Sequence, residues 1–251
     1  MGEKTNIAWT EATWNPWVGC EKVSPGCDNC YAEREMNRWG RDFYVVRRTK
    51  DPTFYAPLKK WKEPKLIFTC SFSDFFHADA DQWREDAWKV IEATPWHTYQ
   101  ILTKRPSRML SWLKTHEWPS NAWAGVSVES QQYAHRLDVL AKVPAPVRFV
   151  SAEPLLEKLN LTNWLGELCG EPCECPMGNK IQWVIAGGES GRYFRALDLD
   201  WIRSLRDQCA QARVPFFYKQ DAGPVPVSHP TLDGRLHEAM PDWTPVARAP
   251  V

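Results

Sequence analysis

The sequence predicts an α/β fold in which one parallel sheet forms a partial or closed barrel. Short apolar segments with the composition of buried strands alternate with segments of helical pattern along most of the chain. About seven strands can be counted, and polar residues, several of them charged, follow each one. Such alternation implies parallel pairing through right-handed crossovers. A chain of 251 residues is long enough for one barrel of this kind.

The expected elements follow one another regularly after an irregular first quarter. Residues 1–17 are expected to lead into a first strand that ends near Cys20, and residues 31–40 to form a helix that Gly40 ends. Residues 41–64 are expected to form an elaborated loop or short helices. The later strands are expected at residues 65–70, 99–103, 122–128, 147–151, 181–186 and 216–219, and the helices at residues 81–93, 107–114, 131–143 and 200–213.

Residues 1–221 are therefore predicted to form the barrel, with two irregular segments. An insertion at about residues 160–180 contains Cys169, Cys173 and Cys175. These cysteines could hold zinc or an auxiliary cluster, although no fourth ligand is obvious nearby. Residues 222–251 are rich in proline and are expected to form an extension that wraps the barrel and frays at its end.

The bulk composition excludes some functional classes. The formal net charge is zero, so the chain as a whole does not favour a polyanionic partner. No apolar run of about 18 residues is present, and the N-terminus lacks the apolar core of a signal peptide. We therefore expect a cytoplasmic protein without a membrane span. Its eight cysteines should stay reduced there and serve metal or redox chemistry.

Three cysteines near the N-terminus carry the strongest chemical signal. Cys20, Cys27 and Cys30 have the spacing C-x6-C-x2-C. Converging thiolates suit a soft metal or an iron–sulfur cluster, and three protein ligands leave one coordination position open. Zinc would need a fourth ligand, which His77 or a cysteine of the second group could supply. Inert thiols are the remaining interpretation.

Four stretches of the sequence resemble an uncharacterised, phage-associated family with a three-cysteine motif, which is similar to radical S-adenosylmethionine enzymes. The matches extend from about residue 5 to residue 221. The commonest radical enzymes use the spacing C-x3-C-x2-C with an aromatic residue before the third cysteine, whereas here the first gap is longer and Asn29 precedes Cys30. The matching stretches are residues 6–20, residues 24–33, the Ile-Ala-Gly-Gly-Glu-Ser-Gly segment at 185–191, and residues 215–220.

The resemblance implies a radical-S-adenosylmethionine-like partial barrel. Cys20, Cys27 and Cys30 would bind three irons of a [4Fe–4S] cluster, and S-adenosylmethionine would bind the fourth. A one-electron reductant would then cleave that cofactor to methionine and a 5′-deoxyadenosyl radical, which abstracts hydrogen from a substrate. Repair of nucleic acid, similar to that of spore photoproduct lyase, is one such activity. The alternative is a non-catalytic, zinc-stabilised module that binds nucleic acid or a protein.

The predicted strand ends supply the candidate cofactor-binding residues. In barrels that the family resembles, the end of the second strand holds the amino group of the cofactor; Ser71, Ser73 and Asp74 occupy this place, although they also suit an ordinary polar turn. The candidates at later strand ends are Lys104 and Lys219 for a carboxylate or an anionic substrate, Glu129 for ribose hydroxyls or the substrate, and Gly187, Gly188 and Glu189, where the backbone could approach the cofactor.

Residues 33–65 give a local reason to expect nucleic acid as a partner. This segment holds ten lysines and arginines against five acidic residues, with aromatic residues between them. Basic and aromatic side chains in alternation suit contact with phosphates and stacking on bases. A solvated cationic loop is the alternative interpretation.

Overall fold

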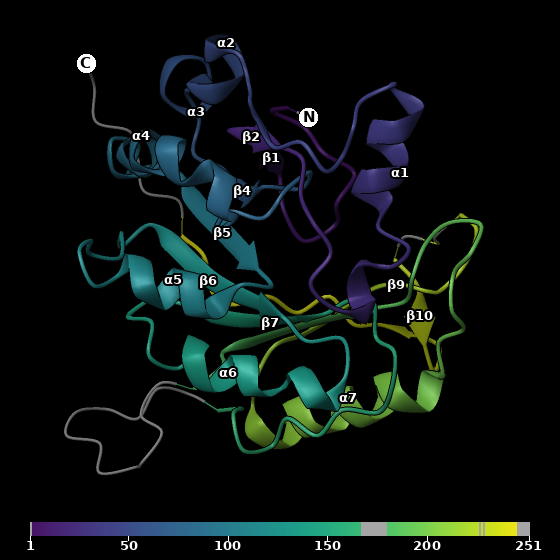
Figure 1. Cartoon of the computed structure of the whole chain (residues 1–251). Helices are drawn as coiled ribbons and strands as arrows, with labels where there is room; N and C mark the ends of the chain where they lie inside the picture. Colours follow the sequence, from purple (N-terminus) through teal and green to yellow (C-terminus); the bar gives the residue numbers. More distant parts are fainter. Residues whose placement is uncertain (1, 167–179, 226, 228, 245–251) are drawn as a thin grey trace, which may run out of the picture.

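Figure 1 shows the computed structural model, which describes residues 2–166, 180–225, 227 and 229–244. At its centre, seven parallel strands form a sheet that curls into half a barrel, in the order β1-β4-β5-β6-β7-β8-β9. Since β1 and β9 are the two edges of this sheet, the barrel is partial, and the predicted α/β class is confirmed. The strands are β1 (Ala12–Trp14), β4 (Leu66–Thr69), β5 (Thr98–Thr103), β6 (Ala122–Ser127), β7 (Arg148–Ala152), β8 (Trp183–Gly187) and β9 (Phe216–Gln220).

Each strand of the sheet pairs in parallel with the strand that follows it in the sheet order. All seven carboxyl ends therefore meet at one edge. This edge is where a sheet of this kind places its functional loops. The pairing of β8 with β9 is irregular at Ala186 and Gly187, so the last two strand ends are offset from the regular register.

The helices of the regular part of the chain cover the convex face of the sheet (Figure 1). Their apolar sides pack in one large cluster with alternate strand residues such as Tyr99 and Ile101. Residues between these in sequence point to the opposite face, because strand side chains alternate. The helices are α4 (Asp81–Glu92), α5 (Pro106–Trp112), α6 (His135–Leu140) and α7 (Leu199–Ala212).

Aromatic side chains fill much of the concave face. Trp9, Phe149 and Trp183 form the centre of a second buried cluster, with ring centroids 5.6–6.3 Å apart. Gly125 makes this packing possible, because a Cβ atom at residue 125 would overlap the ring of Phe149. Near the carboxyl ends of β6 and β7 the same face carries Ser127 and Ser151, which are both buried. The concave face is therefore apolar at its base and polar toward the strand ends.

The prediction that the first strand ends near Cys20 is wrong. The strand in the sheet, β1, ends at Trp14, and Asn15 and Pro16 follow it. Residues Trp17–Val18 form β2, which pairs antiparallel with β3 (Arg47–Arg48) in a separate ribbon. Proline has no backbone N–H to donate to a ladder, which is one reason why the sheet strand does not continue through residue 16.

The expected short helices between the first strand and the regular part of the chain are confirmed. Helix α1 (Tyr31–Arg38) follows the cysteine segment, and α2 (Asp51–Phe54) and α3 (Ala56–Lys59) lie within the basic region. Gly40 has a φ of 64°, a left-handed conformation that suits glycine just after a helix. Helix α1 stands apart from the row formed by α4, α5, α6 and α7 in Figure 1.

The C-terminal segment covers the edge of the sheet. After the hairpin of β10 (Thr231–Leu232) and β11 (Arg235–Leu236), the chain runs antiparallel to β9. The Tyr218 N–H donates to the His237 carbonyl at 2.7 Å, and the Ala239 N–H donates to the Phe216 carbonyl at 3.1 Å. These bonds satisfy polar groups that an edge strand otherwise exposes.

The second cysteine group, Cys169, Cys173 and Cys175, lies outside the residues that the structure describes. Just before it, Leu161 and Leu165 pack into the helix-side cluster, so this part of the expected insertion belongs to the main core. None of the helices in the described part of the chain is long and apolar enough to span a membrane.

Candidate functional site

The three predicted metal-binding cysteines lie on a loop over the carboxyl ends of the strands. This cysteine loop, residues 20–30, contains a single 3₁₀ turn, Pro25–Cys27. Gly26 lies against the end of β6, because a Cβ atom at this residue would be 3.0 Å from Cδ of Glu129. The loop is therefore placed at the edge where all seven strands end.

Cys20, Cys27 and Cys30 are all free thiols and are half-buried. Cys30 immediately precedes α1, so its sulfur is close to the first backbone N–H groups of that helix. Burial raises the pKa of Cys30, and the N–H groups of Glu33 and Ala32 and the charge of Lys104 oppose the rise. Thiols of this kind lose their protons when a metal binds.

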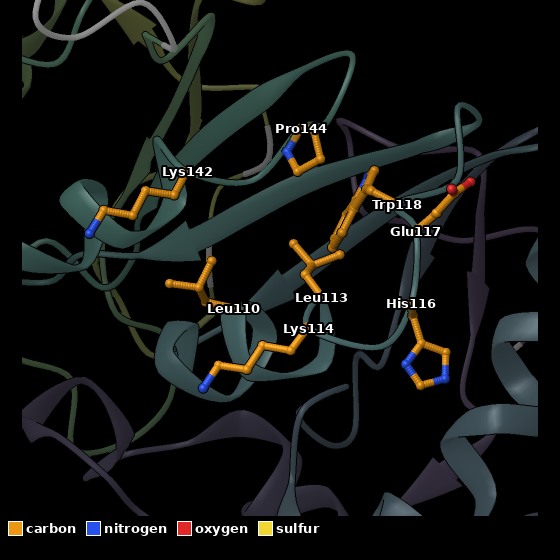
Figure 2. Close-up of a pocket in the computed structure, with 8 residues that line it drawn as sticks. All are labelled: Leu110, Leu113, Lys114, His116, Glu117, Trp118, Lys142 and Pro144. Carbon is orange, nitrogen blue, oxygen red and sulfur yellow. The ribbon is translucent and has the colours of Figure 1, made fainter.

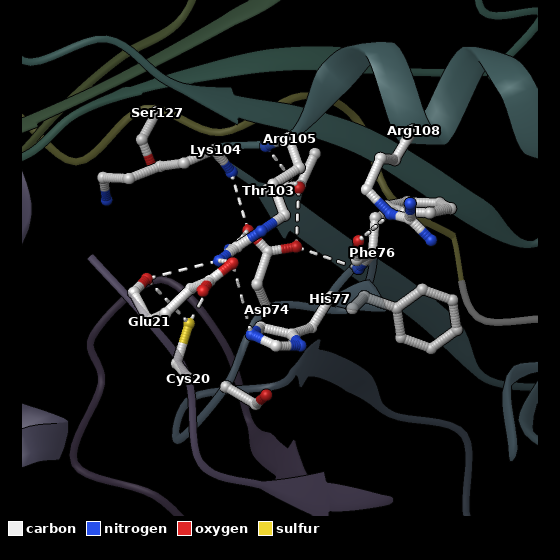
Figure 3. Close-up of polar contacts among 12 residues, drawn as sticks. Cys20, Glu21, Asp74, Phe76, His77, Thr103, Lys104, Arg105, Arg108 and Ser127 are labelled. Carbon is white, nitrogen blue, oxygen red and sulfur yellow. Dashed lines mark hydrogen bonds and ion pairs between the residues drawn. The ribbon is translucent and has the colours of Figure 1, made fainter. Parts of the chain in front are cut away.

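Cys20 is held in a polar network with Arg105 (Figure 3). Nη1 of Arg105 lies 3.7 Å from Sγ of Cys20, and Nη2 lies 3.2 Å from the Glu21 carbonyl oxygen. Burial and the nearby Asp74 carboxylate raise the pKa of Cys20 to about 12, while Arg105 acts to lower it. A guanidinium at this position would stabilise a thiolate once the proton has left.

Asp74 is a predicted cofactor-binding residue, and both of its carboxylate oxygens have partners within the chain. Its Oδ1 accepts from Thr103 Oγ1 at 2.6 Å and from the Phe76 N–H at 2.8 Å. Its Oδ2 accepts from the Lys104 N–H at 2.9 Å and lies 3.1 Å from Nη1 of Arg105. The carboxylate thus ties the end of β4 to the end of β5 and holds Arg105 beside Cys20.

Ser71 and Ser73, the other candidates at the end of β4, also make contacts within the chain. The Ser73 hydroxyl donates to the Gly19 carbonyl, and the Ser71 hydroxyl accepts from Asn15 Nδ2 at 2.9 Å. The Tyr31 hydroxyl donates to the Ser71 carbonyl. This turn therefore fastens the two ends of the cysteine loop to the sheet.

Glu189 holds the other side of the cysteine loop. It accepts from Asn29 Nδ2 at 2.9 Å and pairs with Arg195 Nη2 at 2.6 Å. Arg195 in turn donates to the Pro25 carbonyl at 2.8 Å and lies 3.4 Å from Asp28. Burial alone would raise the pKa of Glu189, but the hydrogen bonds from Arg195 and Asn29 hold it below its ordinary value.

The two glycines before Glu189 have steric reasons for their identity. A Cβ atom at Gly188 would overlap the backbone of Ala222, and one at Gly187 would lie 2.9 Å from Oε1 of Glu153. The same Glu153 oxygen accepts from Lys219 Nζ at 2.8 Å. The predicted residues Gly187 and Lys219 therefore both lie beside the same carboxylate oxygen of Glu153.

Two of the predicted cofactor-binding residues keep polar atoms without a partner in the described part of the chain. One oxygen of the buried Glu129 pairs with Arg136 at 2.9 Å, but Oε1 has no hydrogen bond. No hydrogen bond or ion pair to a described residue is found for Nζ of Lys104, although its charge acts on Cys30. These atoms are the ones that a ligand at the strand ends could engage.

His77 was a candidate fourth ligand for zinc, and it does lie near Cys20 in the network of Figure 3. Burial and the charge of Arg105 lower its pKa, so the ring is neutral near pH 7. Its Nδ1 accepts from the Asp79 N–H at 3.2 Å, which leaves the proton on Nε2 and no lone pair there for a metal. Among the residues described, no three His, Cys, Asp or Glu side chains are arranged around one ion position.

The structure also contains a cavity of about 670 Å³. Figure 2 shows the side chains that line it. Leu113 and Trp118 line it from the connection between α5 and β6, and Lys142 and Pro144 from the connection between α6 and β7. These connections lead into the amino ends of the strands. The cavity is therefore at the edge of the sheet opposite the cysteine loop.

Several residues of the site are not predicted by the sequence. Arg195 contacts Pro25 of the cysteine loop from 170 residues away, and Asn29 within the loop contacts Glu189, 160 residues away. No local pattern in the sequence indicates these contacts. Arg105 and Glu153 do carry a signal, because each lies two residues after the end of a predicted strand.

Replacing Arg195 by methionine is expected to loosen the cysteine loop without unfolding the protein. Arg195 joins Glu189 to Pro25, and a hydrogen bond to a charged group contributes about 1.5–3 kcal/mol. We expect amide hydrogen exchange in residues 26–30 to rise by about 10-fold or more. Arg203→Met, which removes a similarly exposed arginine paired with two aspartates, should leave this segment unchanged. Equal exchange in both variants would contradict the assigned role.

The comparisons with known proteins give the chain a family but no activity. No curated protein and no solved structure matches it. One family model matches residues 4–241, which is most of the chain, and it is described as a protein of unknown function (DUF5131). The chain therefore belongs to the DUF5131 family.

Proposed function

We propose that the protein is a radical S-adenosylmethionine-type enzyme in which Cys20, Cys27 and Cys30 hold three irons of a [4Fe–4S] cluster. The observation that carries this proposal is the cysteine loop itself. Three free thiols lie on one short loop, and that loop is fastened over the polar ends of a half-barrel sheet. Thiolate sulfur is the donor that such clusters require.

The surroundings of the loop suit a cluster with an open position. Arg105 and Lys104 place positive charge near Cys20 and Cys30, and hydrogen bonding near cluster sulfurs is one way in which proteins adjust reduction potentials. When bound, the cluster and S-adenosylmethionine would supply a 5′-deoxyadenosyl radical after one-electron reduction. The chain would have to orient that cofactor and keep water away from it.

The residues with available polar atoms define the cofactor roles that we propose. Lys104 would contact the carboxylate of S-adenosylmethionine, and Glu129 would accept from its ribose hydroxyls. Lys219 pairs with Glu153, and an anionic substrate could take the place of Glu153 in this ion pair. Ser71, Ser73 and Asp74 remain candidates for the amino group, but their contacts with the chain would have to change first.

Anaerobic purification followed by metal analysis tests the proposal. We expect about four irons and four sulfides per chain, as one [4Fe–4S] cluster requires, with broad visible absorption. After reduction with dithionite in the presence of S-adenosylmethionine, we expect 5′-deoxyadenosine. A colourless protein with one zinc per chain would contradict the proposal and support the zinc-stabilised module instead. An iron–sulfur protein that never forms 5′-deoxyadenosine would leave cluster binding intact and contradict the activity.

A further inference from the structure

The exposed aromatic side chains of this protein are not scattered over its surface. All five exposed aromatic side chains in the described part of the chain come from two short segments, residues 31–44 and 193–194. Large apolar side chains are mostly buried, so a group of exposed rings in one place indicates a binding surface. We call this set the aromatic rim; its members are Tyr31, Trp39, Tyr44, Tyr193 and Phe194.

Both segments of the rim adjoin the cysteine loop. The Tyr193 carbonyl accepts from Asn29 Nδ2 at 2.8 Å, one residue before Cys30. On the other side, Trp39 packs on Phe72 with ring centroids 5.3 Å apart. Phe72 packs against the same small buried cluster as Cys20 and Cys30. The helical rise of about 1.5 Å per residue places Trp39 about 12 Å along α1 from Tyr31. The rim therefore flanks the candidate site from two directions.

Two of the rim residues, Trp39 and Tyr193, each carry an arginine against the ring. The Cζ atom of Arg41 is 5.9 Å from the centre of the Trp39 ring, and that of Arg192 is 5.5 Å from the centre of the Tyr193 ring. Neither arginine has an acidic partner among the residues that the structure describes, whereas Arg34 and Arg38 on α1 both lie near Glu35. The free positive charge of this surface thus coincides with its exposed rings.

A single-stranded nucleic acid matches this arrangement in chemistry. Its backbone repeats a phosphate and a base, and proteins bind it by pairing cationic side chains with aromatic rings on which bases stack. A duplex hides its base faces within the stack, so it cannot use exposed rings in this way. Aromatic residues and arginine are also enriched at protein interfaces, but Arg41 and Arg192 have no acidic partner among the described residues and so remain available for phosphates.

We propose that the aromatic rim binds single-stranded nucleic acid, with bases stacked on Trp39 and Tyr193 and phosphates at Arg41 and Arg192. The rim would present a nucleotide of the bound strand to the cysteine loop, and this second statement rests on the proposed function. An enzyme that acts on a base needs that base out of the stack, which an unpaired strand provides without further cost.

Binding of short labelled oligonucleotides to the full chain tests the proposal. Fluorescence anisotropy would compare single-stranded DNA, single-stranded RNA and the corresponding DNA duplex, with iron and sulfide measured on the same preparation. Tyr193→Ala and Trp39→Ala should each raise the Kd for the single strand by about 5- to 100-fold, the effect of losing one stacked base. Tyr193→Phe keeps the ring and should bind as the unchanged protein does. Leu236→Ala, at an exposed position on the C-terminal hairpin, should have no effect.

Salt dependence gives a second measurement that folding defects do not imitate. Arg41→Gln should reduce the slope of log Kd against log salt concentration by about 0.7, because one phosphate contact is lost. No binding of single strands, tighter binding of the duplex, or equal binding by Tyr193→Ala and Tyr193→Phe would each overturn the inference. Oligonucleotide binding by a protein without iron would support the aromatic rim and contradict the proposed enzyme. A protein that holds the iron–sulfur cluster but binds no oligonucleotide would contradict the rim and leave the proposed enzyme standing.

Discussion

Replacing any one of Cys20, Cys27 and Cys30 by alanine is expected to abolish binding of the iron–sulfur cluster. Each cysteine of a [4Fe–4S] site binds a different iron, so loss of one thiolate leaves two protein ligands. The iron content after anaerobic reconstitution should fall from about four per chain to well below one. Visible absorption and the formation of 5′-deoxyadenosine should be lost with it.

The other two described cysteines provide matched controls. Cys209 is buried on α7 within the helix-side cluster, and Cys209→Ala should retain the cluster despite some loss of stability. Cys70 is also buried, and burial together with the neighbouring Asp74 and Cys20 raises its pKa, so Cys70→Ala tests whether a fourth thiol near Cys20 contributes. Equal iron content in Cys27→Ala and in the unchanged protein would contradict the assignment of the three ligands.

The parts of the fold that depend on local sequence were predictable. Strands β4 to β9 lie close to the predicted segments, because continuous apolar runs mark strands that are buried on both faces. The first strand was misplaced because β2 has the same composition as a sheet strand. Its partner, β3, is about 30 residues away in the chain, and no local pattern assigns β2 to a separate ribbon.

The candidate site was predictable in position but not in its contacts. Placing polar residues after every strand follows from the parallel order, and Glu129, Glu153 and Lys219 do lie at one edge. Which carboxylate oxygen remains available for a ligand depends on partners that are distant in the sequence. Thr103 occupies an Asp74 oxygen and Arg195 occupies Glu189, and a sequence pattern does not encode such pairs.

Replacing Asp74 by alanine is expected to lower the free energy of unfolding by about 3–5 kcal/mol, the effect of breaking a buried ion pair. Asp74 is 5% exposed, and its substitution leaves Arg105, Thr103 and two backbone N–H groups without their acceptor. Urea denaturation followed by tryptophan fluorescence measures the change. Asp233→Ala is the control, because this exposed aspartate also pairs with two arginines but remains in water.

Asp74→Asn distinguishes a structural role from a cofactor-binding role. Asparagine keeps Oδ1 for Thr103 but turns an NH₂ group toward Arg105 and the Lys104 N–H, which replaces two hydrogen bonds by repulsive contacts. If the carboxylate mainly supports the fold, this variant should also be destabilised, by about 1–3 kcal/mol. If it mainly binds the amino group of S-adenosylmethionine, stability should be unchanged and only affinity for that cofactor should fall. Four donors within the chain already occupy the two carboxylate oxygens of Asp74, so we expect Asp74→Asn to lose stability. Arg105 would then no longer be held beside Cys20, and the cysteine loop would lose this contact.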